Sequence, residues 1–208
     1  MLETNKEYSR RILEYGQHVK FVTQTTQQGF GHAVYCAREA IGNEPFLLML
    51  GDHINRSDSN FSCAQQLLDA YQGKDTSVVG LRLTPQELIA NFGTVTGVWL
   101  EENRLINITE FAEKPNLEYV QTCLCIPGLR DDQYLTVFGQ YILKPEVFDI
   151  LEINIKNSLR ERGDFQLTGA LDRVRQTNGF MRLIIEGQRF DTGLPDYYLE
   201  TLVNFRKE

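Results

Sequence analysis

A continuous apolar run that ends at a carboxylate constrains the fold of this chain more than any other feature. Phe46-Leu47-Leu48-Met49-Leu50 leads directly into Gly51-Asp52. An uninterrupted apolar run predicts a strand that is buried on both faces, as in a parallel sheet. Ligands of open α/β sheets bind beyond the carboxyl ends of the strands. Asp52 is therefore either a turn residue that caps a core strand or a ligand of a metal ion at this edge.

Asp191 is a second acid in a similar setting. It ends the strand-like segment Arg189-Phe190-Asp191, and a glycine turn follows at Gly193. Two carboxylates on one edge of a sheet suit a hard cation such as Mg²⁺ that carries phosphate oxygens. We therefore expect Asp52 and Asp191 to converge and to hold Mg²⁺ as the cofactor.

Strand-like and helix-like segments alternate along the first part of the chain. The apolar patterns there predict helices at residues 3–15, 32–41 and 63–71, and strands at 20–24, 46–52 and 76–81. This alternation predicts an α/β fold with a doubly wound, mostly parallel, Rossmann-like sheet. Later strands at 94–100, 105–111 and 135–143 indicate an antiparallel hairpin insertion. The remaining predicted elements are a short helix from about residue 85, a strand at 180–186, and helices at 145–152, 166–176 and 195–205. No linker interrupts the sequence, so residues 1–208 are expected to form a single domain.

Charge and cysteine usage limit the partners and the compartment. The chain has 28 acidic and 21 basic residues, a formal net charge of −7, which disfavours nucleic acid and anionic membrane surfaces. The four cysteines lack the spacing of a disulfide framework or a zinc site, so free thiols in a reducing compartment are expected. No apolar run approaches the roughly 18 residues that span a bilayer, and no signal-peptide pattern opens the chain. We expect a cytoplasmic protein with small-molecule partners.

Two further segments have residue types that suit substrate binding. Gln24 opens a polar loop with Gly29, where an amide side chain could pair with a base edge; the alternative is a flexible Gln-rich turn. The loop lacks the third glycine and the downstream acid of a dinucleotide site, which excludes a nicotinamide cofactor. Glu113 and Lys114 follow a strand, where adjacent side chains point to opposite faces. They are either a surface ion pair or, if the backbone turns there, two parts of one site. The three histidines show no ligand spacing.

An ordered set of short motifs extends over nearly the whole chain. In chain order they are Gln24 with Gly29-Phe30-Gly31-His32-Ala33, Leu50-Gly51-Asp52, Asn91-Phe92-Gly93-Thr94-Val95, Phe111-Ala112-Glu113-Lys114-Pro115, Phe138-Gly139-Gln140-Tyr141-Ile142-Leu143, Gly163-Asp164-Phe165-Gln166-Leu167-Thr168 and Phe190-Asp191-Thr192-Gly193. Together they resemble the sugar-1-phosphate nucleotidylyltransferase family, and most of all its bacterial-type UTP–glucose-1-phosphate uridylyltransferases. The resemblance implies an enzyme that transfers a uridylyl group from UTP to glucose 1-phosphate, giving UDP-glucose and pyrophosphate.

The resemblance also implies roles for individual residues. Gln24 and the backbone at Gly29 would recognise uracil, and Asp52 and Asp191 would be catalytic ligands of Mg²⁺. Glu113 would bind the glucose hydroxyls, and Lys114 would be a catalytic contact to the sugar phosphate. The sugar would be bordered by three further residues, Gly93, Val137 and Tyr141.

The chain also departs from the family pattern. The family begins with a strand and a Gly-rich, Arg-bearing phosphate loop, which this sequence lacks, so we expect an N-terminally incomplete domain that is impaired or inactive alone. An exposed apolar sheet edge would result, and such edges invite pairing with another chain, so a homo-oligomer is expected. His53 stands where relatives often have an acidic or aliphatic residue, and residues 117–134 are expected to form an elaborated loop.

Two other functions remain open from the sequence. One is a non-catalytic nucleotide-sugar binding or regulatory module that keeps Gln24 and Glu113. The other is a metal-dependent glycosyltransferase, although Asp52-His53-Ile54 does not supply the expected Asp-x-Asp motif. Uracil and thymine differ by one methyl group, so UTP and dTTP are not distinguished, and the sugar is not fixed beyond the family's preference for glucose.

Overall fold

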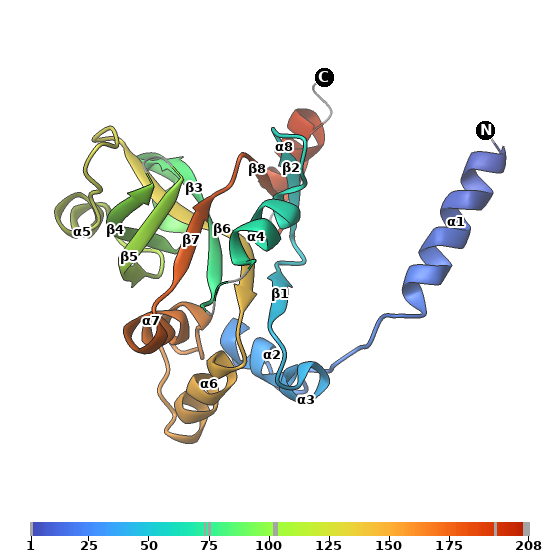
Figure 1. The fold of residues 1–208 in the computed structure, drawn as a ribbon, viewed down its shortest axis with the longest axis horizontal. Helices are drawn as coiled ribbons and strands as arrows, with labels where there is room; N and C mark the ends of the chain where they lie inside the picture. Colours follow the sequence, from blue (N-terminus) through green and yellow to red (C-terminus); the bar gives the residue numbers. More distant parts are fainter. Residues whose placement is uncertain (1, 73, 75, 102–103, 194, 206–208) are drawn as a thin grey trace.

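A six-stranded mixed sheet forms the centre of the molecule (Figure 1). The computed structural model describes residues 2–72, 74, 76–101, 104–193 and 195–205. The order across the sheet is β1 (Phe46–Met49), β6 (Gln133–Leu143), β3 (Val78–Pro85), β7 (Met181–Ile184), β5 (Leu105–Ala112) and β4 (Thr94–Glu101). The α/β class and the antiparallel β4–β5 hairpin are therefore as predicted.

The strand directions differ from the predicted, mostly parallel sheet. Strand β6 is antiparallel to both β1 and β3, and among the described strands only β3 and β7 pair in parallel. The sequence predicts residues 135–143 as part of the inserted hairpin, but in the structure they run through the middle of the sheet between β1 and β3. The sequence could not reveal this, because a strand buried on both faces has the same apolar pattern in either direction.

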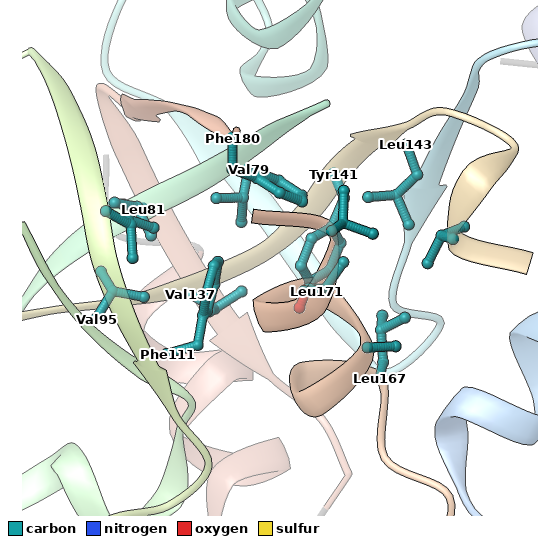
Figure 2. Packing of buried hydrophobic residues seen from close by; sticks show 14 of the residues in the cluster. Val79, Leu81, Val95, Phe111, Val137, Tyr141, Leu143, Leu167, Leu171 and Phe180 are labelled. Atoms are coloured by element: carbon teal, nitrogen blue, oxygen red, sulfur yellow. The ribbon is translucent and has the colours of Figure 1, made fainter. Parts of the chain in front are cut away.

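Helices cover both faces of the sheet, which confirms the doubly wound arrangement. On one face lie α2 (Phe30–Cys36), α6 (Glu146–Lys156) and α7 (Leu167–Asn178). Their side chains pack with Val79, Val137 and Tyr141 of the sheet in the large cluster of Figure 2. Helix α4 (Cys63–Tyr71), whose range the sequence predicted, covers the other face against Val78 and Phe138. Neighbouring residues of one strand thus serve different cores, as strand alternation requires.

A small second sheet was only partly foreseen. Strand β2 (His53–Ser57), which the sequence did not predict, pairs antiparallel with β8 (Gly187–Asp191). Helix α8 (Pro195–Phe205) packs against β8 through Phe190 and Phe205, whose rings meet edge to face at 5.5 Å. This sheet lies beyond the end of β1 (Figure 1), and residues 50–52 connect β1 to β2.

The predicted elaborated loop at residues 117–134 contains a helix. Asn116 caps α5 (Leu117–Cys123) by accepting a hydrogen bond from the Tyr119 backbone N–H at 2.8 Å. Helix α5 packs with the 3₁₀ helix η1 (Gln86–Asn91), which is the short helix predicted near residue 85. Their shared cluster covers the hairpin end of the sheet.

The N-terminal segment differs most from prediction. Helix α1 (Leu2–Gly16) forms as predicted and stands away from the body in Figure 1, and the helix predicted at 32–41 divides into α2 and α3 (Arg38–Ile41). The strand predicted at 20–24 does not form, and Phe21 is 91% exposed. Strand β1 borders only β6 among the described strands, so its side chains are half-buried instead of buried on both faces. A strand requires a partner, and no described segment pairs with the outer edge of β1.

Two other predictions concern the whole chain. The four cysteines are unpaired, as predicted. Among the described residues, no helix combines the length and the apolar composition needed to cross a bilayer.

Candidate active site

The pairing of β2 with β8 brings Asp52 and Asp191 together. His53 lies directly opposite Asp191 in this pairing, and Asp52 is the residue immediately before His53. The backbone N–H and hydroxyl of Thr192 donate to the Asp52 carbonyl at 2.8 and 2.7 Å, which fixes the crossing of the two segments. One ligand atom from each of Asp52, His53 and Asp191 lies within 4.8 Å of the others. The two acids therefore converge as the sequence predicted, although they lie 139 positions apart in the sequence.

These carboxylates lie on a cleft of about 540 Å³. The volume is within the usual range for a small-molecule site. The cleft also contains most of the other predicted site residues: Gly93, Glu113, Lys114, Val137 and Tyr141. Its lining comes from β6, α7, the segment after β5 and the turn before β4 as well as from the small second sheet, so the site exists only in the assembled fold.

The backbone conformation at Lys114 decides whether Glu113 and Lys114 form a surface ion pair or belong to one site. Lys114 is a non-glycine residue with φ of 44°, two positions after the last residue of β5. This left-handed conformation breaks the strand alternation, so both side chains line the same cleft. Such a conformation costs about 1 kcal/mol for a residue with a Cβ, and it is typical of functional sites. The alternative of a plain surface ion pair is therefore not supported.

A group of close contacts surrounds Glu113. The Thr168 hydroxyl, in the first turn of α7, donates to Glu113 Oε2 at 2.6 Å. A Cβ on Gly93 would lie 3.3 Å from the same oxygen and 3.4 Å from Val137 Cγ2, so a side chain at residue 93 would crowd this wall. Burial, together with the charge of Glu113, raises the pKa of Tyr141. Tyr141 therefore stays protonated at neutral pH, and its hydroxyl can donate a hydrogen bond to a ligand.

The two predicted nucleotide-side residues, Gln24 and Gly29, are not among the residues that line the cleft, although Gly29 directly precedes its lining residue Phe30. Gln24 Nε2 contacts the Gly29 carbonyl at 3.2 Å and His32 Nδ1 at 2.8 Å, so Gln24 is held by its own loop. Gly29 has φ of 100°, and a Cβ there would lie 2.9 Å from the carbonyl oxygen of Phe165. The loop is thus packed against residues 164–166 and is not a flexible turn.

Arg189 and His53 were not assigned by sequence reasoning, yet both border the site. Arg189 is only 8% exposed; its Nη1 donates to the Val137 carbonyl, and its guanidinium carbon lies 3.7 Å from the centre of the Phe92 ring. Burial lowers the pKa of Arg189 to about 10, so it remains a cation at neutral pH. Burial and, to a smaller extent, Arg189 lower the pKa of His53, which is therefore neutral at pH 7.

The sequence contained a signal for one of these two residues only. Arg189 lies two positions before Asp191, so strand alternation places both on one face of β8. His53 reaches Asp191 through the β2–β8 register, which no local pattern encodes. Thr168 was within a recognised motif, but its bond to Glu113 depends on how α7 packs on the sheet.

Comparison with known proteins identifies the family. The profile of the family described as "Nucleotidyl transferase" matches residues 1–208. The chain belongs to this family. A UTP–glucose-1-phosphate uridylyltransferase of Staphylococcus saprophyticus is 31% identical over 187 residues, which is 89% of this chain and 58% of that protein. The corresponding protein of Staphylococcus epidermidis is 31% identical over 188 residues, 90% of this chain and 59% of that protein.

Solved structures agree with this assignment. A UDP-glucose pyrophosphorylase complexed with UDP-glucose superposes with a TM-score of 0.79 at 29% identity, over 99% of this chain and 74% of that chain. A UTP-bound enzyme of Acinetobacter baumannii, at 24% identity and a TM-score of 0.71, supports the fold alone. The chain thus spans somewhat less than three fifths of the length of these curated relatives. The nucleotidyltransferase fold predicted from the sequence is confirmed.

Proposed function

We propose that this chain carries the site for transfer of a uridylyl group from UTP to glucose 1-phosphate. The observation that carries the proposal is the convergence, in one cleft, of Asp52 and Asp191 with Glu113 and Lys114. Two carboxylates suit a cation that holds phosphates, and a carboxylate beside an ammonium suits a sugar phosphate. The names of the Staphylococcus relatives support uridylyl transfer over other chemistry with the same fold.

The proposed reaction requires positioning and charge neutralisation. A phosphate oxygen of glucose 1-phosphate forms a new bond to the α-phosphorus of UTP, while the bond from that phosphorus to the bridging oxygen of pyrophosphate breaks. Asp52 and Asp191 would hold Mg²⁺, which, when bound, neutralises phosphate oxygens. Lys114 would hold the attacking phosphate in line, because an ammonium binds phosphate as a point charge. No residue needs to form a covalent intermediate, so the rate gain comes from orientation and electrostatics.

Specificity would come from the two sides of the cleft. Glu113, held by Thr168, would accept hydrogen bonds from sugar hydroxyls, and Tyr141 and Val137 would line that side. Gly93 would let the sugar lie close to the backbone. On the nucleotide side, Gln24 and the backbone at Gly29, which a hydrogen bond from Gln24 Nε2 to the Gly29 carbonyl holds together, would pair with the edge of uracil through their remaining polar groups. These contacts distinguish a pyrimidine from a purine; UTP and dTTP have the same hydrogen-bonding edge.

The test is release of pyrophosphate from UTP and glucose 1-phosphate with Mg²⁺, beside calorimetric binding of UDP-glucose. Asp191→Asn is expected to lower kcat/KM roughly 100-fold or more, the usual cost of removing one electrostatic contact to the transition state. Asp69→Asn, the same change at an exposed acid on α4, is the matched control and should have no effect. We expect the chain to be impaired alone, so a low rate of release still supports the proposal, whereas binding of UDP-glucose without any pyrophosphate release would instead assign the chain as a nucleotide-sugar binding module. A chain that neither binds UDP-glucose nor releases pyrophosphate would refute the proposal.

We also propose that the chain self-associates through the outer edge of β1. This edge has no partner among the described strands, and Met49 at its end is 49% exposed. Exposed apolar side chains also mark the preceding segment, including Leu13 and Phe21. Unpaired edges template pairing with another strand. Light scattering across micromolar concentrations is expected to show a dimer or a larger species, and a monomer throughout would contradict this proposal.

A further inference from the structure

His53 is a third potential ligand where Asp52 and Asp191 meet. Its Nε2 lies 4.0 Å from Asp52 Oδ1, and its strand partner is Asp191. In an antiparallel pair, residues directly opposite each other project to the same face of the sheet. Only 8% of the His53 side chain is exposed, and its other ring nitrogen, Nδ1, makes no hydrogen bond of ordinary geometry among the described residues, although the Phe138 backbone interacts with the ring. A buried imidazole whose accessible nitrogen faces two carboxylates requires an explanation.

The ring is fixed by a contact that only glycine permits. Gly139 has φ of 90°, and a Cβ there would lie 2.4 Å from His53 Nδ1 and 3.0 Å from Cε1. The imidazole therefore rests on the backbone of β6 with Nδ1 toward the sheet and Nε2 toward the cleft. By contrast, the Asp52 side chain is 57% exposed and can adjust its position. The site thus combines one rigid nitrogen donor with one carboxylate, that of Asp52, that can move toward an ion, whereas Asp191 Oδ1 accepts a hydrogen bond from the Gly193 backbone N–H at 2.8 Å.

The distances suit one shared cation. Bonds of about 2.1 Å place two ligand atoms on opposite sides of an ion about 4.2 Å apart. The observed 4.0 Å between Nε2 and Asp52 Oδ1 is close to this value, and the 4.8 Å limit for the group requires only a small closure by the carboxylates. Arg189 contributes one positive charge nearby against the two carboxylates, which leaves a formal charge of −1 in favour of a cation.

The donor set determines which cation is preferred. Carboxylate oxygens alone suit Mg²⁺, whereas an imidazole nitrogen favours first-row transition ions such as Mn²⁺ and Co²⁺. We propose that His53 is the third protein ligand of the divalent cation held by Asp52 and Asp191, and that it makes this site prefer Co²⁺ and Mn²⁺ to Mg²⁺. The inference rests on the proposed function only in that the same cation would carry the substrate phosphates.

The experiment measures metal binding directly, in the absence of UTP and sugar phosphate. Calorimetric titration of the full chain with CoCl₂, MnCl₂ and MgCl₂ is expected to give at least about tenfold tighter binding of Co²⁺ than of Mg²⁺, following the general order of divalent affinities at nitrogen-containing sites. His53→Asp, which restores an all-oxygen site, should reduce that ratio by about tenfold. His18→Asn, at an exposed histidine in the N-terminal segment, is the matched control and should leave the ratio unchanged.

A spectroscopic measurement separates ligation from a general effect on folding. The Co²⁺-loaded chain should show a strongly shifted imidazole proton resonance that is absent in His53→Asn and present in His18→Asn. An unchanged Co²⁺ to Mg²⁺ ratio in a folded His53→Asp variant would overturn the inference, and so would a wild-type chain that binds none of the three ions. If the ratio changes as expected but no pyrophosphate is released, the proposed function fails and the ligand assignment stands. If UTP is turned over while His53→Asp leaves the ratio of Co²⁺ to Mg²⁺ affinity unchanged, the proposed function stands and the assignment of His53 as a ligand fails.

Discussion

Replacement of Gly29 by alanine should destabilise the protein through a collision as well as through backbone strain. Gly29 has φ of 100° and ψ of 172°, a conformation that is essentially restricted to glycine, and a residue with a Cβ there costs about 1–3 kcal/mol. The new Cβ would also lie 2.7 Å from Asp164 Cβ and 2.9 Å from the Phe165 carbonyl oxygen. Overpacking of this kind costs about 1–3 kcal/mol more, because backbone atoms must shift.

Gly179 provides a matched control for the strain alone. It ends α7 with φ of 72° and the same ψ of 172°, and a Cβ there would meet no described atom within 4 Å. Gly29→Ala should therefore lose about 1–3 kcal/mol more than Gly179→Ala. In a chain of this size, each kcal/mol lowers Tm by about 2–4 °C, so thermal unfolding followed by circular dichroism resolves the difference. Equal losses in the two variants would refute the packing of the Gln24–Gly29 loop against residues 164–166.

Three further predictions concern single side chains. Thr168→Val removes the hydroxyl that donates to Glu113 and should raise KM for glucose 1-phosphate roughly tenfold or more, since a hydrogen bond to a charged group contributes about 1.5–3 kcal/mol. Thr168→Ser keeps the hydroxyl and should restore the original KM, and a KM that stays high in Thr168→Ser would contradict this role. Lys114→Gly should raise the free energy of unfolding in chemical denaturation by up to about 1 kcal/mol, because glycine relieves the backbone strain at φ of 44°. The same variant should lower kcat/KM, and a lower free energy of unfolding would show that the conformation is not strained. Arg182 is fully buried, and burial lowers its pKa to about 8; Nη1 donates to Asn107 Oδ1 at 3.2 Å, but Nε and Nη2 lack partners among the described residues. Arg182→Met should therefore raise the free energy of unfolding by up to about 4 kcal/mol, reduced by about 1 kcal/mol for the lost bond to Asn107, and a decrease would show that this bond outweighs the cost of burying the cation.

The sequence alone determined the features that depend on local chemistry. The apolar run before Asp52, the helix at 63–71 and the hairpin of β4 and β5 follow from periodicity, capping and turn residues, which act over a few positions. The ordered motifs were also sufficient to indicate the family, since most of them lie at the end of a strand or the start of a helix, where ligand-binding residues gather. The convergence of Asp52 and Asp191 was inferred correctly from their similar settings.

The tertiary structure alone decided the features that depend on pairing between distant segments. Residues 20–24 have a strand-like composition, but no described partner pairs with them, whereas β6 acquires partners on both sides and runs antiparallel to them. The left-handed turn at Lys114 and the position of His53 opposite Asp191 also depend on the assembled sheet. The reason is that side-chain periodicity records burial but neither the direction nor the register of a strand. These are fixed by hydrogen bonds and packing between segments far apart in the chain, and here that register completes the candidate site.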